Sequence, residues 1–165
     1  MRCAASVLVV FVLAGVAVCQ VERRAESEYY VRAYALHYGV PLDFVRALIA
    51  QESAWKPCAL SAKGAAGLMQ LMPQTALIFG VRDRCDVRQN VSAGVRYLAH
   101  LLSVFHGDLR LVAAAYLAGE SRVGARGLDY SNPEVVAYVR KIRGRIDAAS
   151  NARHYEYQEG RKACR

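Results

Sequence analysis

Apolar residues recur at helical spacing through most of the chain, and this periodicity constrains the fold more than any other feature. The clearest run lies between residues 91 and 105, where steps of three or four residues place one apolar stripe along a helix. The stripe consists of Val91, Gly94, Val95, Leu98, Leu101, Leu102 and Phe105. Similar runs predict helices near residues 26–38, 41–52, 73–79, 108–118 and from 133 onward. Residues 54–67 are rich in Pro, Ser, Gly and Ala, so any strands should be short and lie there. We predict a mostly α fold.

The length of 165 residues corresponds to one domain that can bury a core. Residues 1–19 have the features of a signal peptide, because Arg2 precedes an uninterrupted apolar run from Val7 to Val18 that is shorter than a membrane span. We expect a mature domain over residues 20–149. Apolar periodicity is lost after about residue 150, which predicts a loosely ordered tail over 150–165. An uncleaved N-terminal anchor is the alternative to a cleaved signal.

The chain is basic, with a formal net charge of +8 that falls to +7 without residues 1–19. A positive field favours acidic polymers, and an exported protein meets anionic envelope components before nucleic acid. A basic solvated surface with no binding role is the other interpretation.

Cys58, Cys85 and Cys164 remain after the signal. In an oxidising compartment we expect one pair; Cys58 with Cys85 would stiffen the Gly-rich stretch, although the connectivity stays open.

Glu52 lies on the apolar face of the predicted helix 41–52. Val45, Leu48 and Ile49 form its stripe, and Glu52 follows Val45 by two helical turns. Burial raises the pKa of a carboxyl group, and a protonated carboxyl can donate its proton to the leaving oxygen of a glycosidic bond. The alternative is a glutamate that faces solvent or pairs with Arg46 or Lys56.

Small residues dominate the stretch after Glu52. Gly64, Gly67 and alanines at 62, 65 and 66 would let a polymer approach the backbone, while Ser61 and Gln70 offer partners for sugar groups. Met69, Leu71 and Met72 would form a wall that packs partly on the core and partly on a ligand. Each of these signals alone is weak, since methionine at such spacing usually belongs to a core.

Four blocks of the sequence together resemble a known family. They are ESAWKPCALSAKGAAGLMQLMPQTA (52–76), NVSAGVRYLAHLL (90–102), AAYLAGESRV (114–123) and PEVVAYV (133–139). In this order they are similar to the soluble lytic murein transglycosylases, whose SLT domain has a goose-type-lysozyme-like fold. The resemblance covers roughly residues 28 to 145, and it implies a compact α+β lysozyme-like domain with a substrate cleft.

The resemblance also implies a reaction. Enzymes of this family cleave the β-1,4 bond between N-acetylmuramic acid and N-acetylglucosamine and leave a 1,6-anhydromuramoyl end. Glu52 matches the sole catalytic acid, which later acts as base on the muramoyl 6-hydroxyl. The substrate-binding positions of the family correspond to Ser61, Gly67, Gln70, Met72, Tyr116, Glu134 and Tyr138.

Glycoside hydrolases generally use two catalytic carboxylates, whereas the resemblance gives this chain only one, Glu52. Asp43, Asp83, Asp86 and Asp108 lie outside the matching blocks, and their spacing pairs none of them with Glu52. Substrate groups would then replace the second carboxylate: the N-acetyl carbonyl would stabilise positive charge at the anomeric carbon, and the 6-hydroxyl would be the nucleophile.

The family's usual A-Y-N-A-G block has Leu117 in place of asparagine. This change puts substrate orientation in doubt, so a catalytically weak wall-binding scaffold and a hydrolysing muramidase stay as alternatives. A cysteine hydrolase that uses Cys58 with His100 or His106 is the most distant alternative.

We expect no metal and no cofactor. We expect a monomer in the periplasm or envelope, with peptidoglycan strands rather than nucleic acid as its partner. Envelope assembly or secretion machinery would be a further partner.

Overall fold

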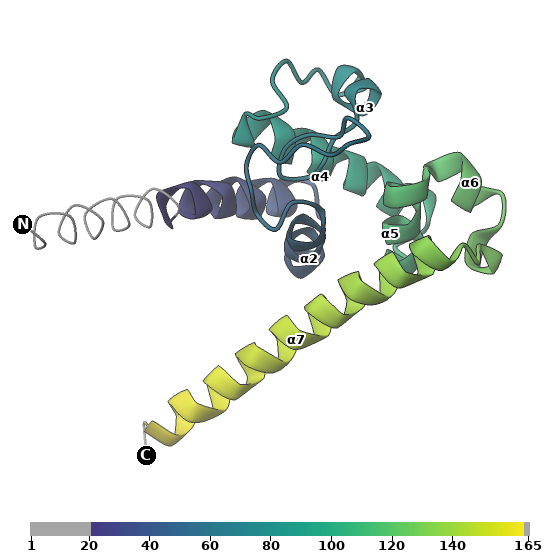
Figure 1. Ribbon diagram of the computed structural model, residues 1–165. Helices are drawn as coiled ribbons and strands as arrows, with labels where there is room; N and C mark the ends of the chain where they lie inside the picture. The colour runs from purple at the N-terminus through teal and green to yellow at the C-terminus, as the bar shows by residue number, and fades with distance from the viewer. Residues whose placement is uncertain (1–20, 164–165) are drawn as a thin grey trace, which may run out of the picture.

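The computed structural model describes residues 21–163, whose regular elements are helices (Figure 1). The first helix covers residues 21–37. It is followed by α2 (Leu42–Glu52), α3 (Pro73–Ile78), α4 (Val87–Val104), α5 (Leu109–Ala118), α6 (Glu120–Gly124), the 3-10 turn η1 (Gly127–Asp129) and α7 (Pro133–Ala163). Within these residues the β structure consists of isolated antiparallel bridges from Ala66 to Leu60 and Leu71. The mostly α prediction, with a short β element after residue 54, is confirmed.

Local sequence signals explain where several helices begin and end. The side chains of Asp86 and Asp108 accept hydrogen bonds from the backbone N–H groups of Gln89 and Arg110, and so cap the starts of α4 and α5. Gly107 ends the turn after α4 with a φ of 81°, a conformation that glycine adopts at low cost. Pro41 precedes α2 as its N-cap residue, one position earlier than the first helical residue.

The core lies where the helices and the long loop 53–72 meet. Helix α2 packs against α7, and α5 packs against both α4 and α7. Large side chains with almost no exposed surface include Val31, Phe44, Leu48, Ile49, Leu68, Met69, Val91, Leu98, Leu101 and Ile142. Each such side chain contributes about 1.5–3 kcal/mol of hydrophobic stabilisation. The loop therefore belongs to the core through Leu68 and Met69, and α7 closes the opposite side.

Helix α7 continues well past the end of its predicted segment. Its C-terminal part, yellow in Figure 1, extends away from the other elements. The prediction of a loose tail from residue 150 is wrong for residues 150–163, which are helical. A helix that is already packed at one end propagates at little cost, even where it lacks the apolar stripe on which the sequence analysis relied.

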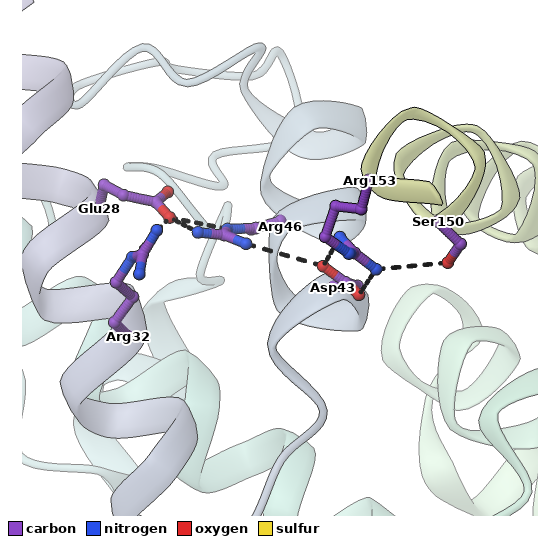
Figure 2. Close-up of polar contacts among 6 residues, drawn as sticks. All are labelled: Glu28, Arg32, Asp43, Arg46, Ser150 and Arg153. Carbon is purple, nitrogen blue, oxygen red and sulfur yellow. Dashed lines mark hydrogen bonds and ion pairs between the residues drawn. The ribbon is translucent and has the colours of Figure 1, made fainter. Parts of the chain in front are cut away.

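A chain of ion pairs links the first helix, α2 and α7 (Figure 2). Glu28 accepts a hydrogen bond from Nε of Arg46 at 2.7 Å, and Arg46 lies 3.7 Å from Asp43. Asp43 in turn accepts two hydrogen bonds from Arg153 of α7, at 2.9 and 2.6 Å. The part of α7 just after residue 150 is thereby tied to α2 through Arg153.

In the part of the chain that the structure describes, none of the helices has the length and apolar character needed to span a membrane. The predicted signal peptide, residues 1–19, and Cys164 lie outside the described residues.

Candidate active site

Glu52 is the last residue of α2, and its side chain is partly buried beside α7. The helix ends at Ser53, whose N–H and hydroxyl both donate to the carbonyl of Ile49. The hydroxyl of Tyr138, from α7, donates a hydrogen bond to Oε1 of Glu52. Among the described residues no ion pair joins Glu52 to Arg46 or Lys56. Glu52 thus lies against the packed helices, as its position on the apolar stripe predicts.

The surroundings of Glu52 favour the protonated carboxyl. Burial raises the pKa of Glu52, and the hydrogen bond from Tyr138 opposes this by lowering it; the net direction is upward. Desolvation disfavours the charged form because the packed helices cannot replace the lost hydration. A carboxyl group of this kind is suited to donating a proton and later taking one back.

Tyr116 of α5 is a second tyrosine whose phenol interacts with the charge of Glu52. Burial raises the pKa of the Tyr116 phenol well above its ordinary value, and the charge of Glu52 adds to the effect. The same two causes raise the pKa of Tyr138. The hydroxyl of Tyr116 donates to the carbonyl of Met69 at 2.7 Å, and its ring packs 5.5 Å from that of Tyr97. Both phenols therefore remain hydrogen-bond donors next to the acid.

Ser61 and Gln70 form hydrogen bonds within the loop itself. Oγ of Ser61 accepts from the N–H of Ala65 at 3.0 Å. Nε2 of Gln70 donates to the carbonyls of Ala59 and Gly67, at 2.8 and 3.0 Å, from a backbone with a φ of 48°. These side chains hold the shape of the loop, and in the described chain no hydrogen bond engages Oε1 of Gln70.

Gly67 is required by close packing as well as by its backbone. Its φ is 86°, and a Cβ added there would lie 2.1 Å from Nδ2 of Asn90 and 2.2 Å from the carbonyl oxygen of Arg84. Asn90, fully buried in α4, accepts from the N–H of Met69 at 2.8 Å and donates to the carbonyls of Ala66 and Arg84, at 3.0 and 2.8 Å. Asn90 thus organises the loop, a role that the sequence analysis missed. Its signal was a polar residue one turn before Gly94 on an apolar stripe.

The other predicted positions differ in their surroundings. Met72 is 44% exposed, whereas Met69 and Leu71 are buried, so only Met72 of this string presents a side chain to the surface. Glu134 is exposed in the first turn of α7, and no hydrogen bond or ion pair among the described residues joins it to Glu52. Leu117 is 39% exposed.

A disulfide joins Cys58 to Cys85, with 4.5 Å between their Cα atoms. It is the pair that the sequence analysis considered, and it ties the loop after Glu52 to the segment before α4. Arg84 supports the same connection by donating to the carbonyls of Gly64 and Leu71. A disulfide sulfur is not a free nucleophile, so the structure contradicts the cysteine-hydrolase alternative.

Two large hollows of the described chain do not include Glu52 in their lining. One of about 660 Å³ is lined by the loop that begins at Ala54, and one of about 540 Å³ lies between α7 and the start of α5. The substrate cleft itself therefore stays a prediction from the resemblance. Within residues 21–163, no group of three His, Cys, Asp or Glu side chains is placed to hold a metal ion.

Comparison with known proteins gives consistent results. The sequence model of the transglycosylase SLT domain family matches residues 29–134. The membrane-bound lytic murein transglycosylase F of Pseudomonas fluorescens is 31% identical over 135 residues, which cover 76% of this chain and 28% of that protein.

Solved structures match as well. The lytic transglycosylase Slt of Pseudomonas aeruginosa, an inactive mutant with glutamine in place of a glutamate, has a TM-score of 0.63 at 28% identity. The match covers 72% of this chain and 23% of that one. A 70-kDa soluble lytic transglycosylase in complex with bulgecin A has a TM-score of 0.63 at 26% identity, covering 79% of this chain and 24% of the other. This chain thus spans less than a third of the length of each.

Proposed function

The chain belongs to the transglycosylase SLT domain family, and from this premise we propose that it is a peptidoglycan lytic transglycosylase. It cleaves the β-1,4 bond between N-acetylmuramic acid and N-acetylglucosamine and forms 1,6-anhydromuramoyl ends. The observation that carries the proposal is the partly buried Glu52, held by Tyr138 on the apolar side of α2, with its pKa raised by burial.

Glu52 acts first as acid and then as base. Its proton passes to the glycosidic oxygen as the bond to the anomeric carbon of the muramoyl sugar breaks, and the N-acetyl carbonyl stabilises the positive charge that develops there. The muramoyl 6-hydroxyl then attacks the anomeric carbon and returns a proton to the Glu52 carboxylate. The acid is regenerated and no water is consumed, so a second catalytic carboxylate is not needed.

The tyrosines support this cycle from the helical side. Tyr138 engages Oε1 of Glu52, which leaves Oε2 to carry the proton toward the sugar. Tyr116 fixes the loop through the carbonyl of Met69 and so positions the acid relative to the loop. Positioning of this kind lowers the barrier because the reacting groups do not have to be ordered in the transition state.

The remaining parts of the proposal concern the whole protein. Residues 1–19 direct export and residues 20–149 form the catalytic domain, which acts in the bacterial envelope as a monomer without a cofactor. Its partners are peptidoglycan strands, and envelope assembly or secretion machinery would determine where it acts. The relatives named above, murein transglycosylases of soluble and membrane-bound types, support the envelope as the location.

Mass spectrometry of the muropeptides released from purified murein tests the reaction. We expect ends that are one water lighter than reducing muramic acid. Glu52→Gln should lower the rate by about a thousandfold or more, because glutamine cannot donate the proton. Glu26→Gln, an exposed glutamate on the first helix, is the matched control and should keep the native rate.

Each alternative predicts a different product. Reducing ends would establish a muramidase, and binding of murein without cleavage by the native chain would establish a scaffold. Either result would contradict the proposed reaction, as would a Glu52→Gln chain that cleaves at the native rate with a native circular dichroism spectrum. Bulgecin A, found bound to one solved relative, is expected to inhibit cleavage.

A further inference from the structure

A hollow of about 660 Å³ lies between the first helix and the loop that follows Glu52. The helix contributes Arg23 and Arg24, and the loop contributes Trp55 and Lys56 within the stretch from Ala54 to Ala59. The family match begins at residue 29, so the two arginines come from a part of this chain that the family model does not cover. One wall of the hollow is therefore the loop inside the family match, and the other is the start of the first helix, which precedes the match.

Arg24 and Trp55, which both line the hollow, are in contact with each other. The guanidinium carbon of Arg24 lies 3.5 Å from the centroid of the Trp55 ring. Stacking on an aromatic face satisfies the flat side of a guanidinium and leaves the N–H groups on its edge directed outward. Ala54 and Trp55 both have left-handed backbone, with φ of 49° and 64°. Non-glycine residues keep this conformation only where surrounding contacts hold them, which is common at binding sites.

The side chains that line the hollow carry a net positive charge. In the described part of the chain, no hydrogen bond or ion pair engages the side-chain nitrogens of Arg23, Arg24 or Lys56, and no acidic residue is among those that line the hollow. Glu28, one turn after Arg24, interacts with the Arg24 charge through space, but its hydrogen bonds come from Arg46 and Arg32 (Figure 2). An anion entering from outside would therefore meet cations whose side-chain nitrogens hold no hydrogen-bonded carboxylate among the described residues.

We propose that this hollow is a subsite for a carboxylate of the peptide stem on a murein strand whose glycan lies at Glu52. The inference rests on the proposed function. The hollow is close to the acid in the sequence, since Ala54, two residues after Glu52, is among its lining residues. Peptide stems end in free carboxylates, and the outward edge of a stacked guanidinium matches a carboxylate with two parallel hydrogen bonds. Lys56 adds a second cation without a geometric requirement.

Binding of defined murein fragments tests the subsite directly. Trp55 is the single tryptophan of the chain, so its fluorescence reports on this hollow, and calorimetry provides an independent Kd. All binding is measured on Glu52→Gln chains, which should not cut the fragments. Arg24→Gln with Lys56→Gln should raise the Kd for stem-bearing fragments about tenfold. Arg126→Gln with Arg140→Gln, which also removes two positive charges but from exposed positions outside the hollow, should leave the Kd within about twofold.

The same fragments with their stem carboxylates converted to amides identify the group that is bound. Amidation should raise the Kd of the chain with intact Arg24 and Lys56 about tenfold and should leave the Kd of the doubly substituted chain unchanged. Fragments freed of their stems by an amidase should bind both chains equally.

Three results would overturn the subsite. An unchanged Kd in the doubly substituted chain would show that the cations do not bind the fragment. Equal weakening with stem-free strands would assign the effect to the sugar's own lactyl carboxylate. Equal weakening by Arg126→Gln with Arg140→Gln would assign it to the general positive field. In each case cleavage of murein by the native chain would leave the proposed function standing, whereas a chain that neither binds nor cleaves any fragment would contradict both.

Discussion

The helical side and the loop side of Glu52 are built on different principles. On the helical side, apolar packing between α2 and α7 buries the carboxyl, and Tyr138 makes the polar contact with it. On the loop side, residues 53–72 satisfy one another: Gln70 and Ser61 bond to the loop backbone, and Asn90 ties the loop to α4. The acid's chemistry is therefore set by helix packing, while the shape of the surface that faces a substrate is set by hydrogen bonds.

Substitutions on the two sides of Glu52 should therefore have different effects. A change on the helical side should alter the pKa of the acid and leave the fold intact, because it exchanges one polar contact in a packed interface. A change in the loop should alter the fold locally, because a small number of hydrogen bonds hold the loop in shape. Its backbone also includes residues in the left-handed region, such as Gln70, which depend on those bonds.

Gly67→Ala should have the largest effect on stability among the loop changes. The new Cβ would collide with the Asn90 amide and the Arg84 carbonyl, and φ is 86°. We expect a loss of about 3 kcal/mol in the free energy of unfolding, measured by urea denaturation. Gly64→Ala is the matched control: its φ is 84°, but nothing lies within 4 Å of the new Cβ, so it should cost only about 1 kcal/mol. Equal costs at the two positions would show that packing against Asn90 does not hold the loop.

Tyr138→Phe should act on the pKa of Glu52 rather than on the fold. The hydrogen bond from Tyr138 lowers that pKa, so its removal raises the pKa further. The acid form then persists to higher pH, and the alkaline limb of kcat/KM on murein should move upward. The rate at its optimum should fall about tenfold, because Oε1 is no longer held.

Tyr116→Phe provides the comparison for that profile. Its hydroxyl donates to the Met69 carbonyl rather than to Glu52, so the alkaline limb should stay at its native position while the loop is loosened. A limb that moves downward in Tyr138→Phe, or that moves equally in both variants, would disprove the assigned role of the Tyr138 hydrogen bond.

Arg153→Ala should have the smallest effect. It removes the two hydrogen bonds to Asp43 that tie α7 to α2, but the arginine side chain is 51% exposed. Exposed ion pairs contribute about 0–1 kcal/mol, so the thermal midpoint and the alkaline limb should change little. A loss of several kcal/mol, or a shifted limb, would mean that the end of α7 helps to hold Tyr138 against the acid.

Sequence reasoning predicted the features that depend on periodicity. Helix positions followed from apolar spacing and capping residues, and the burial of Glu52 followed from its two-turn distance from Val45. The helical continuation beyond residue 150 was missed because a solvent-exposed helix needs no apolar stripe. The bonds of Ser61 and Gln70 within the loop, and the role of Asn90, depend on a backbone path with left-handed residues. That path is decided by tertiary contacts, so no spacing in the sequence reveals it.

The central claim is that Glu52 keeps its proton to a higher pH than an ordinary glutamate. The direct measurement is a carbon-13 NMR titration of glutamate-labelled protein, in which the Glu52 carboxyl resonance is identified by its absence in Glu52→Gln. The account predicts a midpoint above the ordinary value of 4.5, moving higher in Tyr138→Phe. A midpoint at or below 4.5 would contradict it.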